Sequence, residues 1–186
     1  MVVAFGHSFE SVLEAAKLGS HWAWVAIYRE IAGPVTGFLR ARGVNDPEDA
    51  AGDVFFEISR RINEFTGDED SFHTRVFVMA HQRMVRDRHS ERPPRSRLAD
   101  RVLDRVRRDS GTPDFGMGDD VGEELRRAFE TLSQDQRDIL ALRVVGALSV
   151  EQTAEVLNRG IDTVRSLQRK ALAKVRRITP GEVVLS

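Results

Sequence analysis

The sequence predicts an all-α protein: two small helical domains joined by a flexible linker. Apolar residues recur at spacings of three and four along most of the chain, which is typical of helices that bury one face. No alternating apolar pattern of useful length, as a half-buried strand would show, is present. Residues 91–122 instead combine prolines, glycines and arginines with few apolar anchors. We therefore expect one domain over residues 8–90, a linker over 91–122 and a second domain over 123–178.

Two helices are predicted at the start of the first domain. Ser8 can cap a helix that runs to about Leu18. Ser20 can cap a second helix that ends near Gly43, where glycine can adopt a positive φ. Pro34 lies inside this second segment and is expected to bend or break it, because proline has no N–H to donate.

Two further helices complete the first domain. Asp46 and Pro47 are typical of a helix start, since proline is favoured in the first turn. Apolar residues then follow helical spacing as far as Ile62. A turn-rich acidic loop over residues 65–70 precedes a fourth helix, which we expect from Phe72 to about residue 88.

Residues 148–171 have the pattern of a helix-turn-helix. Ser149 begins a sequence close to a capping box, a short amphipathic helix follows, and residues 158–160 supply a tight turn. Asp162 or Thr163 is expected to cap the second helix. The inner side of that helix is apolar, and its outer side carries Arg165, Gln168, Arg169, Lys170 and Lys174. Such side chains can hydrogen-bond base edges in a major groove.

Charge is strongly segregated although the formal net charge is only −1. Residues 45–59 contain five acids and no base, residues 83–108 contain ten arginines, and residues 159–177 contain seven bases against one acid. Separate acidic and basic segments indicate a polyanionic partner and a second, different partner.

Residues 129–177 resemble region 4 of the sigma-70 family, in particular the small group-4, extracytoplasmic-function (ECF) sigma factors. The matching residues are Leu132, Gln136, Arg137, Leu140, Leu142, Arg143, Leu148, Ser149, Glu151, Ala154, Leu157, Thr163 to Ser166, Ala171 and Leu172. The upstream half is similar to region 2 at Ile27, Tyr28, Phe38, Asp46 to Ala50, Asp53 to Phe55, Phe65 to Gly67 and Phe72 to Arg83.

The resemblance implies a non-enzymatic bacterial transcription initiation factor that binds core RNA polymerase and promoter DNA, with an anti-sigma factor as a further partner. Implied contacts with the −35 element are Thr163, Arg165, Ser166, Gln168, Arg169, Lys170 and Lys174. Implied contacts with the −10 element, where DNA is opened, are Phe65, Phe72, His73, Arg75, Gln82, Arg83 and Arg86. Implied contacts with core polymerase are Glu48, Asp49, Asp53, Phe56 and Glu57.

Two other readings remain open at this point. One is a conventional two-domain repressor or activator that uses the same helix-turn-helix without polymerase. The other is a sigma-like regulator that does not melt promoter DNA. Arg75 and Val76 stand where the family usually has Trp-Leu, and Gln82 stands where it usually has asparagine, which keeps the second reading open.

Composition argues against an enzyme, a cofactor and a metal site. The chain has no cysteine, which excludes a thiol nucleophile, a disulfide framework and any cysteine-ligated metal. Its five histidines are scattered without companions at ligand spacing. No run of about 18 apolar residues and no secretory signal is present, so a cytoplasmic location without membrane insertion is expected.

Overall fold

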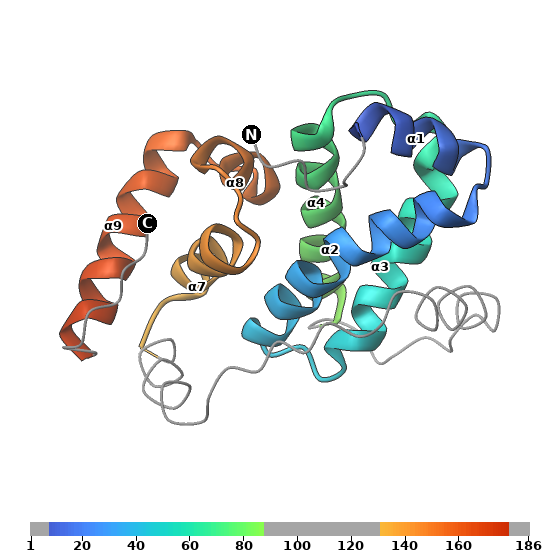
Figure 1. Cartoon of the computed structure of the whole chain (residues 1–186). Helices are drawn as coiled ribbons and strands as arrows, with labels where there is room; N and C mark the ends of the chain where they lie inside the picture. The colour runs from blue at the N-terminus through green and yellow to red at the C-terminus, as the bar shows by residue number, and fades with distance from the viewer. Residues whose placement is uncertain (1–7, 88–130, 179–186) are drawn as a thin grey trace. The chain divides into compact units, whose positions relative to one another are not determined.

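The computed structural model describes residues 8–87 and 131–178, and within these ranges the only regular elements are helices (Figure 1). The predicted all-α class is therefore confirmed. The chain divides into two compact units, Met1–Pro113 and Asp114–Ser186. The expected linker, residues 91–122, lies outside the described residues, as do residues 123–130 of the expected second domain.

The first unit contains α1 (Phe9–Lys17), α2 (His21–Ala41), α3 (Pro47–Arg61), the short 3₁₀ helix η1 (Ile62–Glu64) and α4 (Glu69–Asp87). Two of the three predicted caps form in this unit, whereas Ser20 precedes α2 without a side-chain capping hydrogen bond. The Ser8 side chain accepts a hydrogen bond from the Ser11 N–H at 3.3 Å, and the Asp46 side chain accepts one from the Asp49 N–H at 3.0 Å. Each satisfies a backbone donor that the first turn leaves unpaired.

Two boundaries differ from expectation. First, α2 continues through Pro34 without a break, because the buried side chains of Ile31 and Val35 hold both halves of the helix against the core. Second, α4 begins at Glu69 rather than Phe72. The Asp68 carboxylate accepts a hydrogen bond from the Ser71 N–H at 2.9 Å and so starts the helix earlier.

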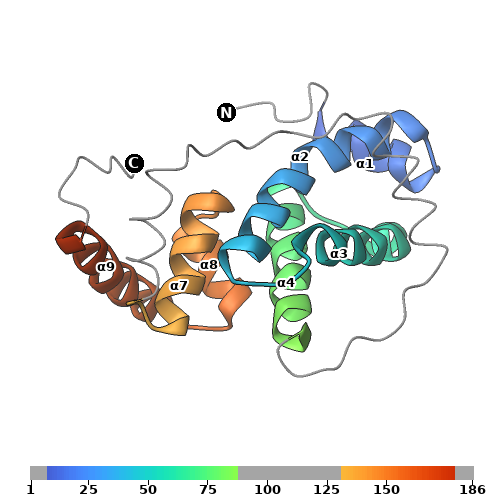
Figure 2. The same ribbon diagram turned by 90° about the horizontal axis from the view of Figure 1, so that it is seen from below.

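The core of the first unit lies where α2, α3 and α4 pack against one another, as both views show (Figures 1 and 2). Phe38 from α2 is fully buried and meets Phe77 of α4 edge-on, with ring centroids 5.8 Å apart. Nearer the start of α2, Trp24 and Tyr28 meet Phe55 of α3, with ring centroids at 5.7 and 5.4 Å. Aromatic edge contacts therefore join α2 to both neighbouring helices.

The second unit contains α7 (Gln134–Leu140), a π-helical turn η2 (Ala141–Val145), α8 (Val150–Leu157) and α9 (Ile161–Ile178). One cluster of buried residues joins α7 to α9, and another joins α7 to α8 and α9. Asn158 has a φ of 51°, the left-handed conformation predicted for this turn. Helix α9 begins at Ile161, so Asp162 and Thr163, predicted as alternative N-caps, lie inside its first turn and the cap prediction is wrong.

Candidate nucleic-acid interface

The position of α9 is set by the helix before it. Ser149 and Gln152 form a complete capping box at the start of α8: the Ser149 N–H donates to Gln152 Oε1 at 2.7 Å, and the Gln152 N–H donates to Ser149 Oγ at 3.0 Å. Ala154 of α8 and Val164 of α9 are both buried in one cluster with Ile139. The small alanine lets the two helices approach closely, so α8, the turn and α9 form a packed helix-turn-helix.

One face of α9 is buried and the opposite face is basic. Val164, Ala171 and Val175 are buried. At 3.6 residues per turn, Ser166 and Arg169 lie on the opposite side of the helix. The apolar and polar sides predicted for this helix are therefore found in the structure, except that Gln168, predicted for the polar side, lies by the same period beside Val175 and is half-buried.

The cations on this exposed face differ in whether they form ion pairs. Arg165 lies 3.3 Å from a carboxylate oxygen of Glu151 and 3.7 Å from one of Asp162. Arg169 and Lys170 are exposed and make no ion pair with any residue in the described part of the chain. These two side chains can meet an anion without first breaking an ion pair.

Lys174, also predicted to contact DNA, is engaged within the unit. Its Nζ donates to Gln136 Oε1 at 3.3 Å and to the Thr131 carbonyl at 3.4 Å. Its charge therefore supports the packing of α9 on the start of α7. Of the other predicted −35 residues, Thr163 is exposed, whereas Ser166 and Gln168 are half-buried.

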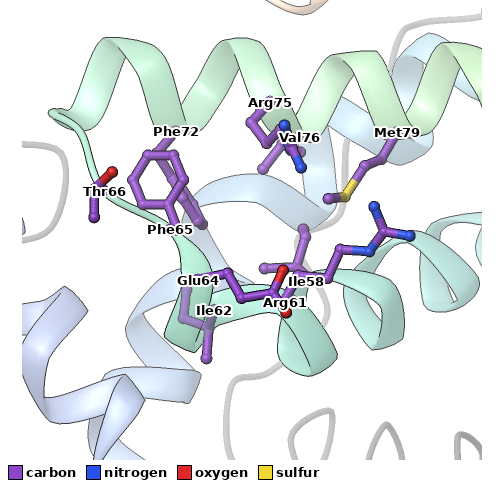
Figure 3. Close-up of a pocket in the computed structure, with 10 residues that line it drawn as sticks. All are labelled: Ile58, Arg61, Ile62, Glu64, Phe65, Thr66, Phe72, Arg75, Val76 and Met79. Atoms are coloured by element: carbon purple, nitrogen blue, oxygen red, sulfur yellow. The ribbon is translucent and has the colours of Figure 1, made fainter.

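A pocket of about 240 Å³ lies in the first unit between α4 and the end of α3 (Figure 3). Its lining comprises Ile58, Arg61, Ile62, Glu64, Phe65, Thr66, Phe72, Arg75, Val76 and Met79. The rings of Phe65 and Phe72 meet edge-on with centroids 5.4 Å apart, and the charged groups of Arg61 and Arg75 are exposed. The pocket thus combines aromatic and aliphatic walls with two arginines and one acid, Glu64, and Arg61 is itself paired with Glu57 at 2.6 Å.

The residues predicted to contact the −10 element do not share one surface. Phe72 is only 2% exposed and packs in the core, although it also contributes to the lining of the pocket. Arg83 is 15% exposed at its side chain and bridges Asp53 at 2.9 Å and Asp87 at 3.1 Å. Burial opposes the charge of Arg83, but its hydrogen bonds to these carboxylates outweigh burial and raise its pKa.

The remaining predicted −10 residues are accessible to different degrees. Phe65 and His73 are half-buried, whereas Arg75, Gln82 and Arg86 are exposed.

The acids of α3 are mostly paired. Glu48 forms an ion pair with Arg40, Asp53 pairs with Arg83, and Glu57 pairs with Arg61 at 2.6 Å. Asp49 lies in the first turn, where a negative charge favours the helix dipole. Phe56 is half-buried beneath the guanidinium of Arg60, 6.0 Å from its ring centroid. The predicted acidic surface therefore carries arginines as well.

Residues 128–177 match the family described as sigma-70, region 4. The C-terminal helix-turn-helix therefore lies within a segment similar to sigma-70 region 4. The chain is 23% identical to the ECF RNA polymerase sigma factor BldN of Streptomyces coelicolor over 173 residues, 92% of this chain and 66% of that protein. The chain thus spans about two thirds of its relative's length.

A solved structure described as CnrH in complex with the cytosolic domain of CnrY has the same fold. It matches with a TM-score of 0.62 and 19% identity, covering 90% of this chain and 94% of that one. The region 4 match and the likeness to BldN support the predicted resemblance to ECF-type sigma-70 factors, while the CnrH structure supports the fold. The alternative of a sigma-like regulator that does not melt promoter DNA is not favoured, because the likeness to BldN, an ECF sigma factor by its description, extends over 92% of this chain.

Sequence analysis missed several residues at these sites. In region 4, Glu151 and Asp162 lie beside Arg165. Both are acidic residues in a segment that was singled out for its basic residues. In the first unit, Arg61 and Met79 line the pocket from two different helices. No local pattern marks such residues, since only the packing of α3 against α4 brings them together.

Across residues 8–87 and 131–178, no helix has the length and apolar character that crossing a bilayer needs.

Proposed function

We propose that the chain is an ECF-type sigma factor that binds core RNA polymerase and directs promoter recognition and transcription initiation. The observation that carries this proposal is the basic outer face of α9, presented by a helix-turn-helix that matches sigma-70 region 4. The first unit supplies a separate pocket with aromatic and cationic walls. A factor that both reads duplex DNA and holds an opened strand needs two such surfaces.

In this proposal α9 reads the −35 element from the major groove. A helix-turn-helix places the N-terminal part of its second helix against base edges. Arg169 can donate two hydrogen bonds to guanine O6 and N7, and Lys170 can contact a phosphate. Thr163, Arg165, Ser166 and Gln168 complete the surface. Lys174 stabilises the position of α9 through its hydrogen bonds to the Thr131 carbonyl and to Gln136 of α7.

The first unit acts on the −10 element. Opening a duplex costs unstacking energy, which is offset when an extruded base enters a shaped pocket. The pocket's volume of about 240 Å³ lies below the roughly 300–1,000 Å³ of sites for drug-sized ligands, which fits a single base better than a larger group. Arg75, Gln82 and Arg86 lie exposed along α4 and can follow the strand backbone.

Core polymerase binds along α3, through Glu48, Asp49, Asp53, Phe56 and Glu57. This assignment rests on the family resemblance and on the exposed or half-buried state of these five residues. CnrH was solved with a second protein, the cytosolic domain of CnrY. We infer that this chain likewise has a protein partner of the anti-sigma type.

Run-off transcription with purified core polymerase tests the proposal. The template is the DNA upstream of the protein's own coding sequence, and the same template with a pre-melted −10 bubble is the control. We expect a discrete start site on the duplex only when the protein is added. Transcription from the bubble alone would mean that the protein does not melt DNA. Silence on both templates, without co-elution with core, would refute the proposal.

A further inference from the structure

We propose that Phe9, in the first turn of α1, is a positioning residue for the pocket of the first unit. Its ring holds Phe65 against Phe72, so that the pocket keeps the shape that admits a base. This inference rests on the proposed function of the pocket. Phe9 is not among the residues that line the pocket, so it acts through Phe65.

Three phenylalanine rings make the contact. Phe9 meets Phe65 edge-on, with centroids 6.4 Å apart and planes at 85°, and it meets Phe72 at 5.4 Å and 47°. Phe65 and Phe72 are themselves 5.4 Å apart at 77°. Each ring therefore touches the other two, and two of the three line the pocket.

The loop that carries Phe65 has little other apolar support. The backbone N–H of Phe65 donates to the Ile62 carbonyl at 3.1 Å, but the side chains of residues 66–68, which follow, are exposed. Edge-to-face ring pairs stabilise a contact beyond the area that they bury. The rings of Phe9 and Phe72 are thus the aromatic contacts that hold the ring of Phe65 in place.

Gly67 shows that the loop closes tightly over Phe65. Its φ is +155°, and a Cβ at this position would lie 3.1 Å from Phe65 Cζ and 3.2 Å from Ser71 Cβ. A side chain here would push the Phe65 ring or the start of α4. The ring of Phe65 is therefore confined between Gly67 and Phe9.

Helix α1 is a firm support for Phe9. The Ser8 side chain caps the helix, and Val12, Leu13 and Ala16 are buried on the same side as Phe9. Phe9 is the first residue of this helix, so its Cα is fixed by the cap. The brace on Phe65 thus comes from a separate element of the unit.

Holoenzyme binding to single-stranded DNA tests the proposal. The probe is the fluorescently labelled non-template −10 strand of the promoter mapped by run-off transcription, together with copies that carry one abasic nucleotide at each position in turn. Wild-type holoenzyme should lose affinity at the position whose base enters the pocket. Phe9→Leu should bind the intact strand about two- to tenfold more weakly, the range expected when, of the two ring pairs that it removes, the pair with Phe65 shapes the pocket. It should bind the abasic strand as the wild type does.

Leu13→Val is the matched control, since Leu13 is buried in the same helix and belongs to none of the three ring contacts. It should leave both affinities unchanged. Equal weakening on both strands by Phe9→Leu, or none on either, would overturn the role of Phe9. If Phe9→Leu does not fold, Gly67→Ala carries the test with the same expected selective loss. A wild type indifferent to every abasic position would instead refute the base-binding role of the pocket.

Discussion

Replacing Arg83 by methionine should destabilise the first unit by about 1–3 kcal/mol. Arg83 is the cation that joins α4 to α3, through Asp53 on α3 and Asp87 on its own helix. Methionine keeps the apolar stem and removes only the charge and its hydrogen bonds. Two carboxylates then face each other without a cation between them.

The magnitude follows from how far the three groups are buried. Removing one partner of a fully buried ion pair costs about 3–5 kcal/mol, whereas an exposed pair contributes about 0–1 kcal/mol. The side chain of Arg83 is 15% exposed, but those of Asp53 and Asp87 are 45% and 28% exposed. The free-energy cost of removing Arg83 therefore lies between these two limits. At about 4–8 °C per kcal/mol for a unit of this size, Tm should fall by roughly 5–20 °C.

Urea and thermal unfolding followed by circular dichroism measure this loss. Arg86→Met is the control on the same helix, because Arg86 is exposed, and it should change the free energy of unfolding by less than about 0.5 kcal/mol. In a double-mutant cycle, Asp53→Asn should cost much less in the Arg83→Met background than in the wild type. Strictly additive effects, or a loss no larger than that of Arg86→Met, would refute the reasoning.

Three further predictions concern a helix cap, a strained residue and the DNA surface. Hydrogen bonds from Ser71 lower the pKa of Asp68 in the folded protein. The contribution of Asp68 to the free energy of unfolding is therefore present above its unfolded pKa and is lost as the pH falls through its folded pKa. Asp68→Ala should therefore lower Tm at neutral pH, and the difference from wild type should shrink in a pH series that descends into the acid range. Ala147 has a φ of 52°, so Ala147→Gly should raise the free energy of unfolding by about 0.5–1 kcal/mol in urea titrations. Arg169→Ala should reduce discrimination between −35 sequences by about 1–3 kcal/mol, whereas Lys170→Ala should weaken binding to all sequences alike and lower the salt slope by about 1 in band shifts.

Local signals predicted the helices well because caps act over a few residues. Ser8, Asp46 and Ser149 each bond a backbone N–H three residues ahead, and each was recognisable from its neighbours alone. Pro34 does not break α2, because tertiary packing holds the helix together on both sides of it. The cost of one lost backbone hydrogen bond is smaller than the gain from burying both halves of α2 on one core.

The candidate site was harder to predict, since exposure and pairing depend on distant parts of the chain. Phe72 and Arg83 have the residue types that DNA contacts need. In the structure the first is a core ring and the second is paired with an acid thirty positions upstream. Arg169 and Lys170 were identified correctly as exposed cations, because the helical period of α9 alone separates its inner from its outer side.

The aromatic contacts between α2 and α3 have a practical consequence. Both tryptophans and the single tyrosine of the chain lie in α2, as Trp22, Trp24 and Tyr28. Intrinsic fluorescence therefore reports on the first unit alone, while region 4 is spectroscopically silent. Trp24 touches Phe55 of α3, the helix assigned to polymerase, and Trp22 is 48% exposed. Titrating unlabelled protein with core polymerase and with −35 duplex should thus separate the two binding events by emission, the first changing it and the second leaving it unaltered.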